Sequence, residues 1–359
     1  MAFTTINNGS LFMNPKLYTG NGGTNNITGV DFQPDLVWLK ERSSAGAGLL
    51  FDAVRTATKF VRSSDSAAEV TAADTLTAFN SDGFTLGADS GNYAANQNSE
   101  TYASWNWKAN GAGSANTDGD INSTVSANTT SGFSIVKYTG NATVSTIGHG
   151  LGVAPKMIIT KNLSRSDAWP VDCRAANDGA GGIMYLNETG SLGAYGNTSP
   201  YPSTAPTNSV YSVGTAGNTN YNGSDLISYC FAEVPGFSKI SQYTGNGSTD
   251  GPFVYTGFKP SFVMLKLGNA AGENWTIFDT KRNNYSLAYT QDNFNVVNSK
   301  LYPNSSGAEE YENFIDILSN GFKIRTASAG GNGNTYKYIY MAFAEAPLVG
   351  TNNIPANAR

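Results

Sequence analysis

Few residue types in this chain could carry out chemistry, and histidine is the first to consider. The chain contains a single histidine, His149, in the Gly-containing stretch 147–151. A histidine metal cluster is therefore excluded, and a Ser-His-Asp triad would have to use this one residue. A lone histidine on a Gly-rich loop is usually an ordinary loop residue, so the sequence predicts no catalytic triad here.

Carboxylates offer the second kind of chemistry, because glycoside hydrolysis needs two carboxyl groups about 5 to 10 Å apart across a sugar. The dense acidic cluster of the sequence consists of Glu309, Glu310, Glu312 and Asp316. An acid pair or a cation site could be built from it, but the composition of 306–314 is more typical of a solvated loop or short helix. We therefore expect no catalytic residue, no metal site and no cofactor, and the protein is not predicted to be an enzyme.

Three Asp-Arg pairs follow apolar runs that end in Lys, at a distance of 11 to 13 residues from the Lys. They are Asp52 with Arg55, Asp172 with Arg174, and Asp279 with Arg282. A feature that occurs in each of three places favours a structural salt bridge or a capped strand end over a ligand contact.

The Asp-Arg pairs belong to a pattern that occurs three times. Each copy begins with Tyr-Thr-Gly-Asn, at residues 18–21, 138–141 and 243–246. A Pro 16 or 17 residues after the Tyr opens the apolar run, and the Lys follows six residues after the Pro. Matching spacings indicate an internal repeat, and its period of 120 and then 105 residues is about the size of a small domain.

Each copy is predicted to be an antiparallel β-sandwich of jelly-roll or lectin-like type. Short strand signals are bounded by Gly and Asn turns, and alternating aromatic residues such as Tyr102, Trp105 and Trp107 are typical of half-buried strands. Residues 66–79 fit either a helical turn or a strand. The predicted divisions are a leader (1–15), three repeats (16–115, 116–235 and 236–347) and an extended tail (348–359). Short Gly-, Ser- and Asn-rich linkers between the repeats predict an elongated molecule.

Composition excludes several classes of partner. The net charge of -5 argues against nucleic acid, because phosphate binding needs a basic surface. No stretch resembles a signal peptide or a transmembrane helix, so we expect synthesis in the cytoplasm of the producing cell and no membrane insertion. The two cysteines, Cys173 and Cys230, are expected to be buried thiols, although a disulfide between them stays open.

The aromatic content permits a binding function. Most strand aromatics are expected to fill the cores, whereas aromatics on loops with small polar neighbours could contact a sugar or another ligand. These candidates are Tyr93, Tyr195, Tyr201, Tyr221 and Tyr285. The region between Asp172 and Val210 differs most among the three copies, and no particular ligand-binding residue can be assigned.

Several stretches together resemble a family of repeat-containing virion proteins of bacteriophages, which is common among marine phages and described as tail-fibre or tail-fibre-like. The stretches that carry this resemblance are 1–6, 17–22, 33–40, 79–87, 105–109, 230–239 and 354–359. No catalytic or binding residue can be carried over from the family. The chain departs from an ordinary fibre because it shows no long shaft and no separate N-terminal attachment domain.

The resemblance implies a structural protein on the surface of the phage particle, at the tail, that contributes to attachment to host-surface glycan. Weak loop contacts would be strengthened by avidity in a homotrimer that also binds other virion proteins. One alternative is a non-catalytic capsid decoration (head fibre) or tail-assembly protein, which should keep apolar patches on strand faces. A weaker alternative is a polysaccharide-degrading tail spike, which should have a cleft with a raised carboxylate pKa.

Overall fold

The computed structural model describes residues 4–174, 182–282 and 296–352, and this part of the chain is almost entirely β. Every pair of strands is antiparallel. The helical elements whose bounds are described are a 3-10 turn, η1 (Gly9–Leu11), and a short helix, α1 (Gly217–Asn220). The all-β class predicted from the sequence is confirmed.

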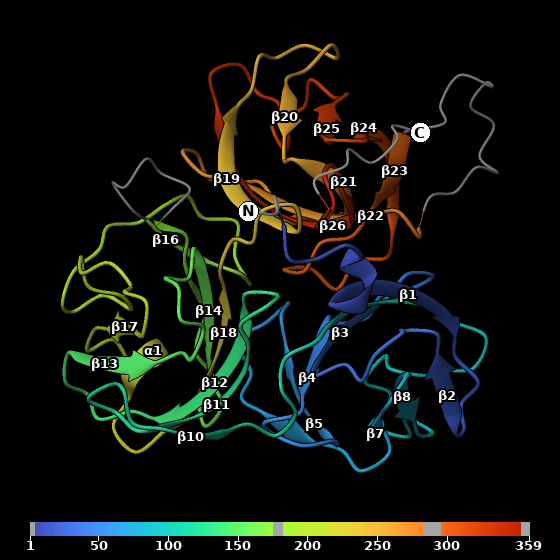
Figure 1. The fold of residues 1–359 in the computed structure, drawn as a ribbon. Helices are drawn as coiled ribbons and strands as arrows, with labels where there is room; N and C mark the ends of the chain where they lie inside the picture. The colour runs from blue at the N-terminus through green and yellow to red at the C-terminus, as the bar shows by residue number, and fades with distance from the viewer. Residues whose placement is uncertain (1–3, 175–181, 283–295, 353–359) are drawn as a thin grey trace.

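The strands fall into three groups along the chain, which we call lobes 1, 2 and 3 (Figure 1). Lobe 1 contains β1 (Met13–Thr19), β2 (Asn25–Thr28), β3 (Leu36–Glu41), β4 (Leu49–Asp52), β5 (Lys59–Arg62), β6 (Val70–Thr71), β7 (Leu76–Asn80), β8 (Gly83–Leu86) and β9 (Thr101–Trp107). Lobe 2 contains β10 (Ser114–Asn116), β11 (Ser123–Asn128), β12 (Phe133–Thr139), β13 (Ser145–Gly148), β14 (Met157–Asn162), β15 (Pro170–Asp172), β16 (Ile183–Tyr185), β17 (Val210–Val213) and β18 (Asp225–Phe231). Lobe 3 contains β19 (Ser238–Thr244), β20 (Phe253–Tyr255), β21 (Phe258–Leu267), β22 (Thr276–Asp279), β23 (Val296–Lys300), β24 (Glu310–Leu318), β25 (Gly321–Ile324) and β26 (Lys337–Pro347).

The main sheet of each lobe has the same strand order. It reads β1-β9-β3-β4 in lobe 1, β12-β18-β14-β15 in lobe 2 and β19-β26-β21-β22 in lobe 3. A smaller sheet accompanies it, with β2-β8 in lobe 1, β13-β17 in lobe 2 and β20-β25 in lobe 3. Residues at equivalent positions of the three lobes can therefore be named from the strand register.

The structure corrects one local expectation and decides another that the sequence left open. The first part of 109–131 was expected to be a flexible linker, but β10 within it pairs with β11 and forms the outer strand of the main sheet of lobe 2. Residues 66–79 contain strand β6 and most of strand β7 rather than a helical turn. In both stretches the backbone groups find partners on a neighbouring strand, and this pairing decides the structure where local composition is ambiguous.

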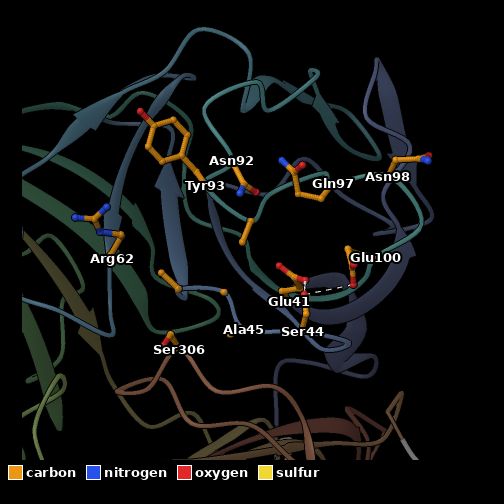
Figure 2. Close-up of a pocket in the computed structure, with 13 residues that line it drawn as sticks. Glu41, Ser44, Ala45, Arg62, Asn92, Tyr93, Gln97, Asn98, Glu100 and Ser306 are labelled. Carbon is orange, nitrogen blue, oxygen red and sulfur yellow. Dashed lines mark hydrogen bonds between the residues drawn. The ribbon is translucent and has the colours of Figure 1, made fainter.

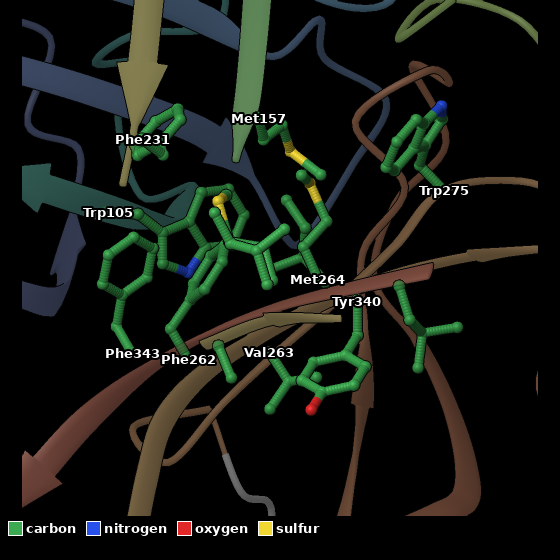
Figure 3. Packing of buried hydrophobic residues seen from close by; sticks show 14 of the residues in the cluster. Trp105, Met157, Phe231, Phe262, Val263, Met264, Trp275, Tyr340 and Phe343 are labelled. Carbon is green, nitrogen blue, oxygen red and sulfur yellow. The ribbon is translucent and has the colours of Figure 1, made fainter. Parts of the chain in front are cut away.

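The three lobes lie around one shared core (Figure 1). Trp107, Phe231 and Phe343 occupy equivalent positions at the ends of β9 and β18 and within β26. Their ring centroids are 5.8 to 6.1 Å apart, so the three rings form a closed triangle. Figure 3 shows how aromatic and methionine side chains from different lobes, Trp105, Met157 and Phe262 among them, pack in this core. The elongated arrangement that the linkers predicted is therefore not the one found, because each copy buries its aromatic strand face against the other two.

Backbone hydrogen bonds close the three lobes into a ring. A loop N–H of each lobe donates to the carbonyl that lies two residues after the strand Lys of the next lobe, and each of these bonds is 2.9 Å long. The bonds run from Glu69 to Leu163, from Leu192 to Gly268 and from Glu309 to Arg42. The third bond joins lobe 3 back to lobe 1, so the cycle is complete.

The strand lysines of the sequence repeat stabilise the same joints. Lys40, Lys161 and Lys266 are fully buried, and each ammonium donates to backbone carbonyls of its own loop and of the preceding lobe. The carbonyls of the preceding lobe belong to Ser305, Ser66 and Thr189, at distances of 2.8, 3.1 and 3.2 Å. The repeated Lys is thus explained by contacts between lobes rather than by ligand binding.

These lysines give a prediction about pH. Burial lowers the pKa of Lys40, Lys161 and Lys266 to about 8. This value lies below the pKa of a lysine in the unfolded chain, so the unfolded chain binds more protons than the folded chain between about pH 8 and 10. The free energy of unfolding should therefore rise with pH over this range. A pKa of about 8 implies a gain of up to about 2 kcal/mol for each lysine between pH 7.5 and 9.5. Urea titrations at both values measure it, and a Lys161→Met variant should show a smaller rise.

The Tyr-Thr-Gly-Asn motif forms a turn with the same contacts in each lobe. The Tyr hydroxyl donates to a buried backbone carbonyl at 2.6 to 2.7 Å. The Gly has no room for a side chain, because a Cβ at Gly20 would lie 2.1 Å from the carbonyl oxygen of Gln97. The amide of the Asn in the motif is bound by a buried Asn from the loop that precedes the last strand, namely Asn96, Asn220 or Asn332. The motif that reveals the repeat is therefore structural.

Candidate functional site

A polar pocket of about 600 Å³ opens in lobe 1 (Figure 2). One wall comes from the end of β3 and the loop that follows it, which provide Glu41 and Ser44. The other wall comes from residues 92–100, the loop that precedes β9, and includes Tyr93 and Glu100. The remaining lining residues are Ala45, Gly46, Ala47, Arg62, Asn92, Ala94, Gln97, Asn98 and Ser306.

Two carboxyl groups face each other across Ser44 in this pocket. The Ser44 hydroxyl donates to Glu41 and lies 3.4 Å from Oε2 of Glu100. Glu41 is almost fully buried. Burial raises the pKa of Glu41, the nearby Glu100 carboxylate raises it further, and the hydrogen bond from Ser44 opposes both effects. The pocket therefore holds a partly desolvated carboxyl pair with hydroxyl and amide groups around it.

The other two lobes do not repeat this carboxyl pair. A Ser of lobe 2 and a Tyr of lobe 3 stand at the position of Glu100. This follows from equivalent backbone hydrogen bonds, which run from Gly20 to Glu100, from Gly140 to Ser224 and from Gly245 to Tyr336. By the same register, Glu41 corresponds to Asn162 in lobe 2 and to Leu267 in lobe 3.

Larger side chains occupy the pocket positions in lobe 2. There Arg165 and Tyr221 stand at the positions of Ser44 and Gln97, and the Arg165 guanidinium stacks 3.9 Å from the Tyr221 ring centroid. Smaller residues at these positions therefore distinguish lobe 1 from lobe 2. Divergence at one position of an otherwise repeated structure is expected where a copy has acquired its own ligand.

The groups that line the pocket can bind a polyhydroxylated ligand. Carboxylates and side-chain amides are hydrogen-bonding groups for a polyhydroxylated ligand, and Tyr93 adds an aromatic ring. A hydrolytic pair needs room for a sugar between its two carboxyl groups. Here the Ser44 hydroxyl bonds Glu41 and lies 3.4 Å from Glu100, so it occupies the space between the two carboxyl groups.

Replacing Glu41 by Gln should make the protein more stable at pH 7, by up to about 1 kcal/mol. The raised pKa means that the folded state favours protonated Glu41, so this group's contribution to stability falls as the pH rises through that range. The gain should shrink at pH 4, where Glu41 is protonated. Urea unfolding at the two pH values tests this, with the exposed Glu345→Gln as a control that should change stability by less than 0.5 kcal/mol.

The acidic cluster predicted from sequence lies elsewhere and is structural. Residues 306–309 form a loop, but strand β24 begins at Glu310, so the expectation of a loop or short helix is wrong for 310–314. Glu309 is buried and pairs with Arg42 at 2.8 Å and with Arg282 at 3.1 Å. Glu312 pairs with Lys300, and Asp316 pairs with Arg325. These carboxylates do not converge on one pocket.

Two of the three Asp-Arg pairs are buried ion pairs. Asp52 accepts from Arg55 at 2.5 Å and from the Tyr229 hydroxyl of lobe 2 at 2.9 Å. Asp279 accepts from Arg282 at 2.6 Å and from the Trp105 indole of lobe 1 at 2.8 Å. Both pairs therefore lie at a joint between lobes, which supports the structural interpretation of these two.

The third pair is not equivalent to the other two. Asp52 and Asp279 each pair across the sheet with the residue that lies two positions after the Pro that opens the apolar run. Asp172 instead pairs with the residue that lies three positions after that Pro. Cys173 therefore takes the position of the buried Asp, and Met341 stands where Trp105 and Tyr229 donate in the other joints. Arg174 lies 3.6 Å from Asp172 but binds the backbone carbonyls of Pro202 and Ser203.

Histidine and cysteine take no part in a reactive cluster. His149 is fully buried, Nε2 lies 3.1 Å from the carbonyl oxygen of Thr207, and burial lowers its pKa. Cys173 and Cys230 are buried free thiols. Asp172 and Cys230 pair with the same residue of β14 from opposite sides, so Cys173, the residue after Asp172, faces the other side of the sheet. The open question of a disulfide is answered: the two cysteines do not pair.

The loop aromatics have different roles. Tyr201 is fully buried and hydrogen-bonds Thr160, so it belongs to the core and not to a binding loop. Tyr195 donates to Asp172 and stacks under Arg174. Tyr93 lines the pocket and packs on Phe60, and Tyr221 is 44% exposed. Tyr285 lies outside the described residues.

The fold and the pocket define an all-β protein with a compact ring of three lobes and a polar pocket in lobe 1. No group of three or more metal-ligating side chains occurs among the residues that the structure describes, and none of the helices described is long and apolar enough to cross a membrane. Residues 8–347 match the family described as "Domain of unknown function (DUF7483)", and the chain belongs to this family. No curated protein and no solved structure matches the chain.

Sequence reasoning did not single out the two carboxylates of the pocket. Glu41 directly follows the repeat Lys40, and Glu100 precedes β9 by one residue. Neither belongs to an acidic cluster or a known motif. The signal that could have found them is the comparison among the three copies, because the equivalent positions in lobes 2 and 3 carry no acid.

Proposed function

We propose that this chain is a structural protein of a bacteriophage particle surface, at the tail, and that the pocket of lobe 1 binds host-surface glycan without cleaving it. The proposal rests on the pocket that Glu41 and Glu100 line, since the equivalent positions of the other lobes carry no acid. The phage assignment is supported by the sequence resemblance alone. In this proposal each lobe is a jelly-roll or lectin-like sandwich, formed by its main and smaller sheets.

The charge of the pocket suggests the kind of sugar. Arg62 already pairs with Asp65 at 2.7 Å, so the two glutamates leave the pocket acidic. Such a pocket favours ligands that donate hydrogen bonds or carry positive charge, such as neutral sugars and amino sugars. Strongly anionic polymers, nucleic acid included, are disfavoured.

The proposal also needs self-association. Because the carboxyl-lined pocket occurs in one lobe of three, a single chain would hold a glycan through one such site. Weak binding to a cell surface becomes strong only when several sites act together, so a homotrimer attached to other virion proteins would provide the avidity. A role as a head decoration or tail-assembly protein is the alternative, and the exposed aromatic strand of lobe 3 is the observation that favours it.

The proposal is tested by the binding of fluorescently labelled protein, in its native oligomer, to intact host cells with and without competing surface polysaccharide. The informative variant is Glu41→Asn with Glu100→Ser, which introduces the residues of lobe 2 at these positions. We expect saturable binding that the polysaccharide removes, and at least about tenfold weaker binding by the variant. Glu345→Gln, far from the pocket in the sequence and on the surface, is the matched control.

Three results would speak against parts of this proposal. Absence of binding at high concentration would exclude attachment and leave the assembly role. Equal binding by the double variant would exclude the pocket as the site. Release of reducing sugar ends from the polysaccharide would show that the protein is an enzyme after all.

A further inference from the structure

A second groove, of about 560 Å³, lies where lobe 2 meets lobe 3. Lobe 2 contributes Val153 and Lys156 from the loop before β14. Lobe 3 contributes Lys239 from β19 and Tyr255 from the end of β20, and the connection between the lobes contributes Glu233. The groove is therefore formed by two lobes, and it is separate from the pocket of Glu41 and Glu100 in its lining residues.

The aromatic side of this groove is unusually exposed. Tyr255 is 56% exposed, Phe253 on the same strand is 46% exposed, and Val254 between them is buried. Side chains two residues apart on a strand point to the same face, so Phe253 and Tyr255 present their rings together. Strand β20 also lies at the edge of its sheet, with β25 as its single neighbouring strand.

The other lobes have no aromatic residue at these positions. Val254 pairs with Phe322 as Ile27 pairs with Phe84, so Phe253 and Tyr255 correspond to Asn26 and Thr28. The equivalent residues of lobe 2 are Thr146 and Gly148, on either side of the buried Ile147. The scaffold does not require aromatics here, and exposed rings carry an unfavourable hydration free energy in the free protein. A ligand that covers them explains their presence.

The charges of the groove indicate the chemistry of that ligand. Lys239 pairs with Glu233 at 3.2 Å, so these two charges offset each other. Lys156 forms no ion pair with any of the described residues, and it leaves the groove with one uncompensated positive charge. An aromatic ring beside a free ammonium fits a pyranose ring that stacks on Tyr255 and places a carboxylate at Lys156.

We propose that this groove binds an acidic saccharide. This inference rests on the proposed recognition of surface glycan and extends it to a second site with the opposite charge preference. The pocket of lobe 1 selects neutral or amino sugars, whereas the groove selects carboxylated ones. A host polysaccharide that contains both kinds of sugar would then contact the protein at two places.

The test uses the full-length protein with two carboxylated probes, oligogalacturonate and oligosialate, and maltoheptaose as a neutral comparison. Saturation-transfer NMR and calorimetry should detect at least one of the acidic probes, with affinity that falls as salt is added. Tyr255→Thr, which introduces the residue of lobe 1, should weaken binding at least about tenfold. Lys156→Ser, which introduces the residue at the equivalent Ser261, should weaken it several-fold and remove most of the salt dependence.

Variants separate this groove from the pocket of lobe 1. The Glu41→Asn, Glu100→Ser variant should bind the acidic probes as the parent does, so failure of one site does not imply failure of the other. The inference is overturned if neither acidic probe binds, or if Tyr255→Thr binds unchanged. It is also overturned if a Phe253→Asn, Tyr255→Thr variant changes the oligomeric mass and leaves probe binding intact, because this face would then be a protein interface.

Discussion

Replacing Arg282 by Met should lower the free energy of unfolding by about 3 to 5 kcal/mol. The Arg282 side chain is completely buried between lobes 3 and 1. Its guanidinium donates to Asp279 at 2.6 Å, to Glu309 at 3.1 Å and to the backbone carbonyl of Ile277 at 2.8 Å. Met fills a similar volume but provides no donor. Two buried carboxylates and a carbonyl would lose a partner, and an uncompensated buried charge is the costly part of the change.

Urea unfolding at pH 7 measures this effect, and two further variants make it specific. Lys259→Met removes an exposed ion pair with Glu345 and should change stability by less than about 1 kcal/mol. Adding Asp279→Cys to Arg282→Met should recover part of the loss, because it removes one of the unpaired charges. Lobe 2 already uses Cys173 at this position. If Arg282→Met loses no more than Lys259→Met, the buried pair does not hold the lobes together.

The repeat itself could be predicted from the sequence because its markers are local. The apolar run before each Lys becomes a fully buried strand, as β3 and β14 show. Tyr102, Trp105 and Trp107 are buried, but β9 is buried on both faces, so the prediction of a half-buried strand is wrong. Spacing and alternation report which residues lie on one face of a strand, and these were enough to predict an all-β chain with three related parts.

The arrangement of the copies could not be predicted in the same way. The sequence pattern of an aromatic strand such as β9 is the same whether the strand packs on the core of its own copy or on that of a neighbouring copy. Trp107 in fact packs against Phe231 and Phe343 of the other lobes. The error at Asp172 has a similar origin, because a shift of one residue in register exchanges the two faces of a strand. Sequence spacing alone did not reveal that Cys173, and not Asp172, is the equivalent of Asp52.

The candidate sites escaped prediction for a different reason. Glu41 and Glu100 are 59 residues apart, and the backbone bond from Arg42 to Thr101 that brings their strands together is a product of the fold. Tyr255 belongs to a strand of three residues with no motif of its own. In each case the informative observation is the difference from the equivalent residue of another lobe. That comparison needs the strand register, which the sequence does not contain.

The turn built around the Tyr-Thr-Gly-Asn motif provides the second large prediction. Asn332 is fully buried, its Oδ1 accepts from the Asn246 amide at 2.8 Å, and its Nδ2 donates to Asn246 Oδ1, Ser248 O and Thr326 O. Asn332→Ala should lower the free energy of unfolding by about 3 kcal/mol, because several buried polar groups lose their partner at once. Asn332→Asp should be at least as harmful, since a carboxylate would face two backbone carbonyls and an amide oxygen where the amide now donates. The exposed Asn334→Ala is the matched control and should change little.

The variants Asn96→Ala and Asn220→Ala test whether the three lobes unfold together. These residues make equivalent bonds in lobes 1 and 2, so each variant should lose a similar amount of stability. Because the lobes share one core and a closed ring of backbone bonds, we expect one cooperative transition in all three variants, with the same midpoint by Trp fluorescence and by circular dichroism. Two separate transitions in any variant would show that a lobe unfolds alone. The shared core would then be an interface between independent domains rather than the centre of one folding unit.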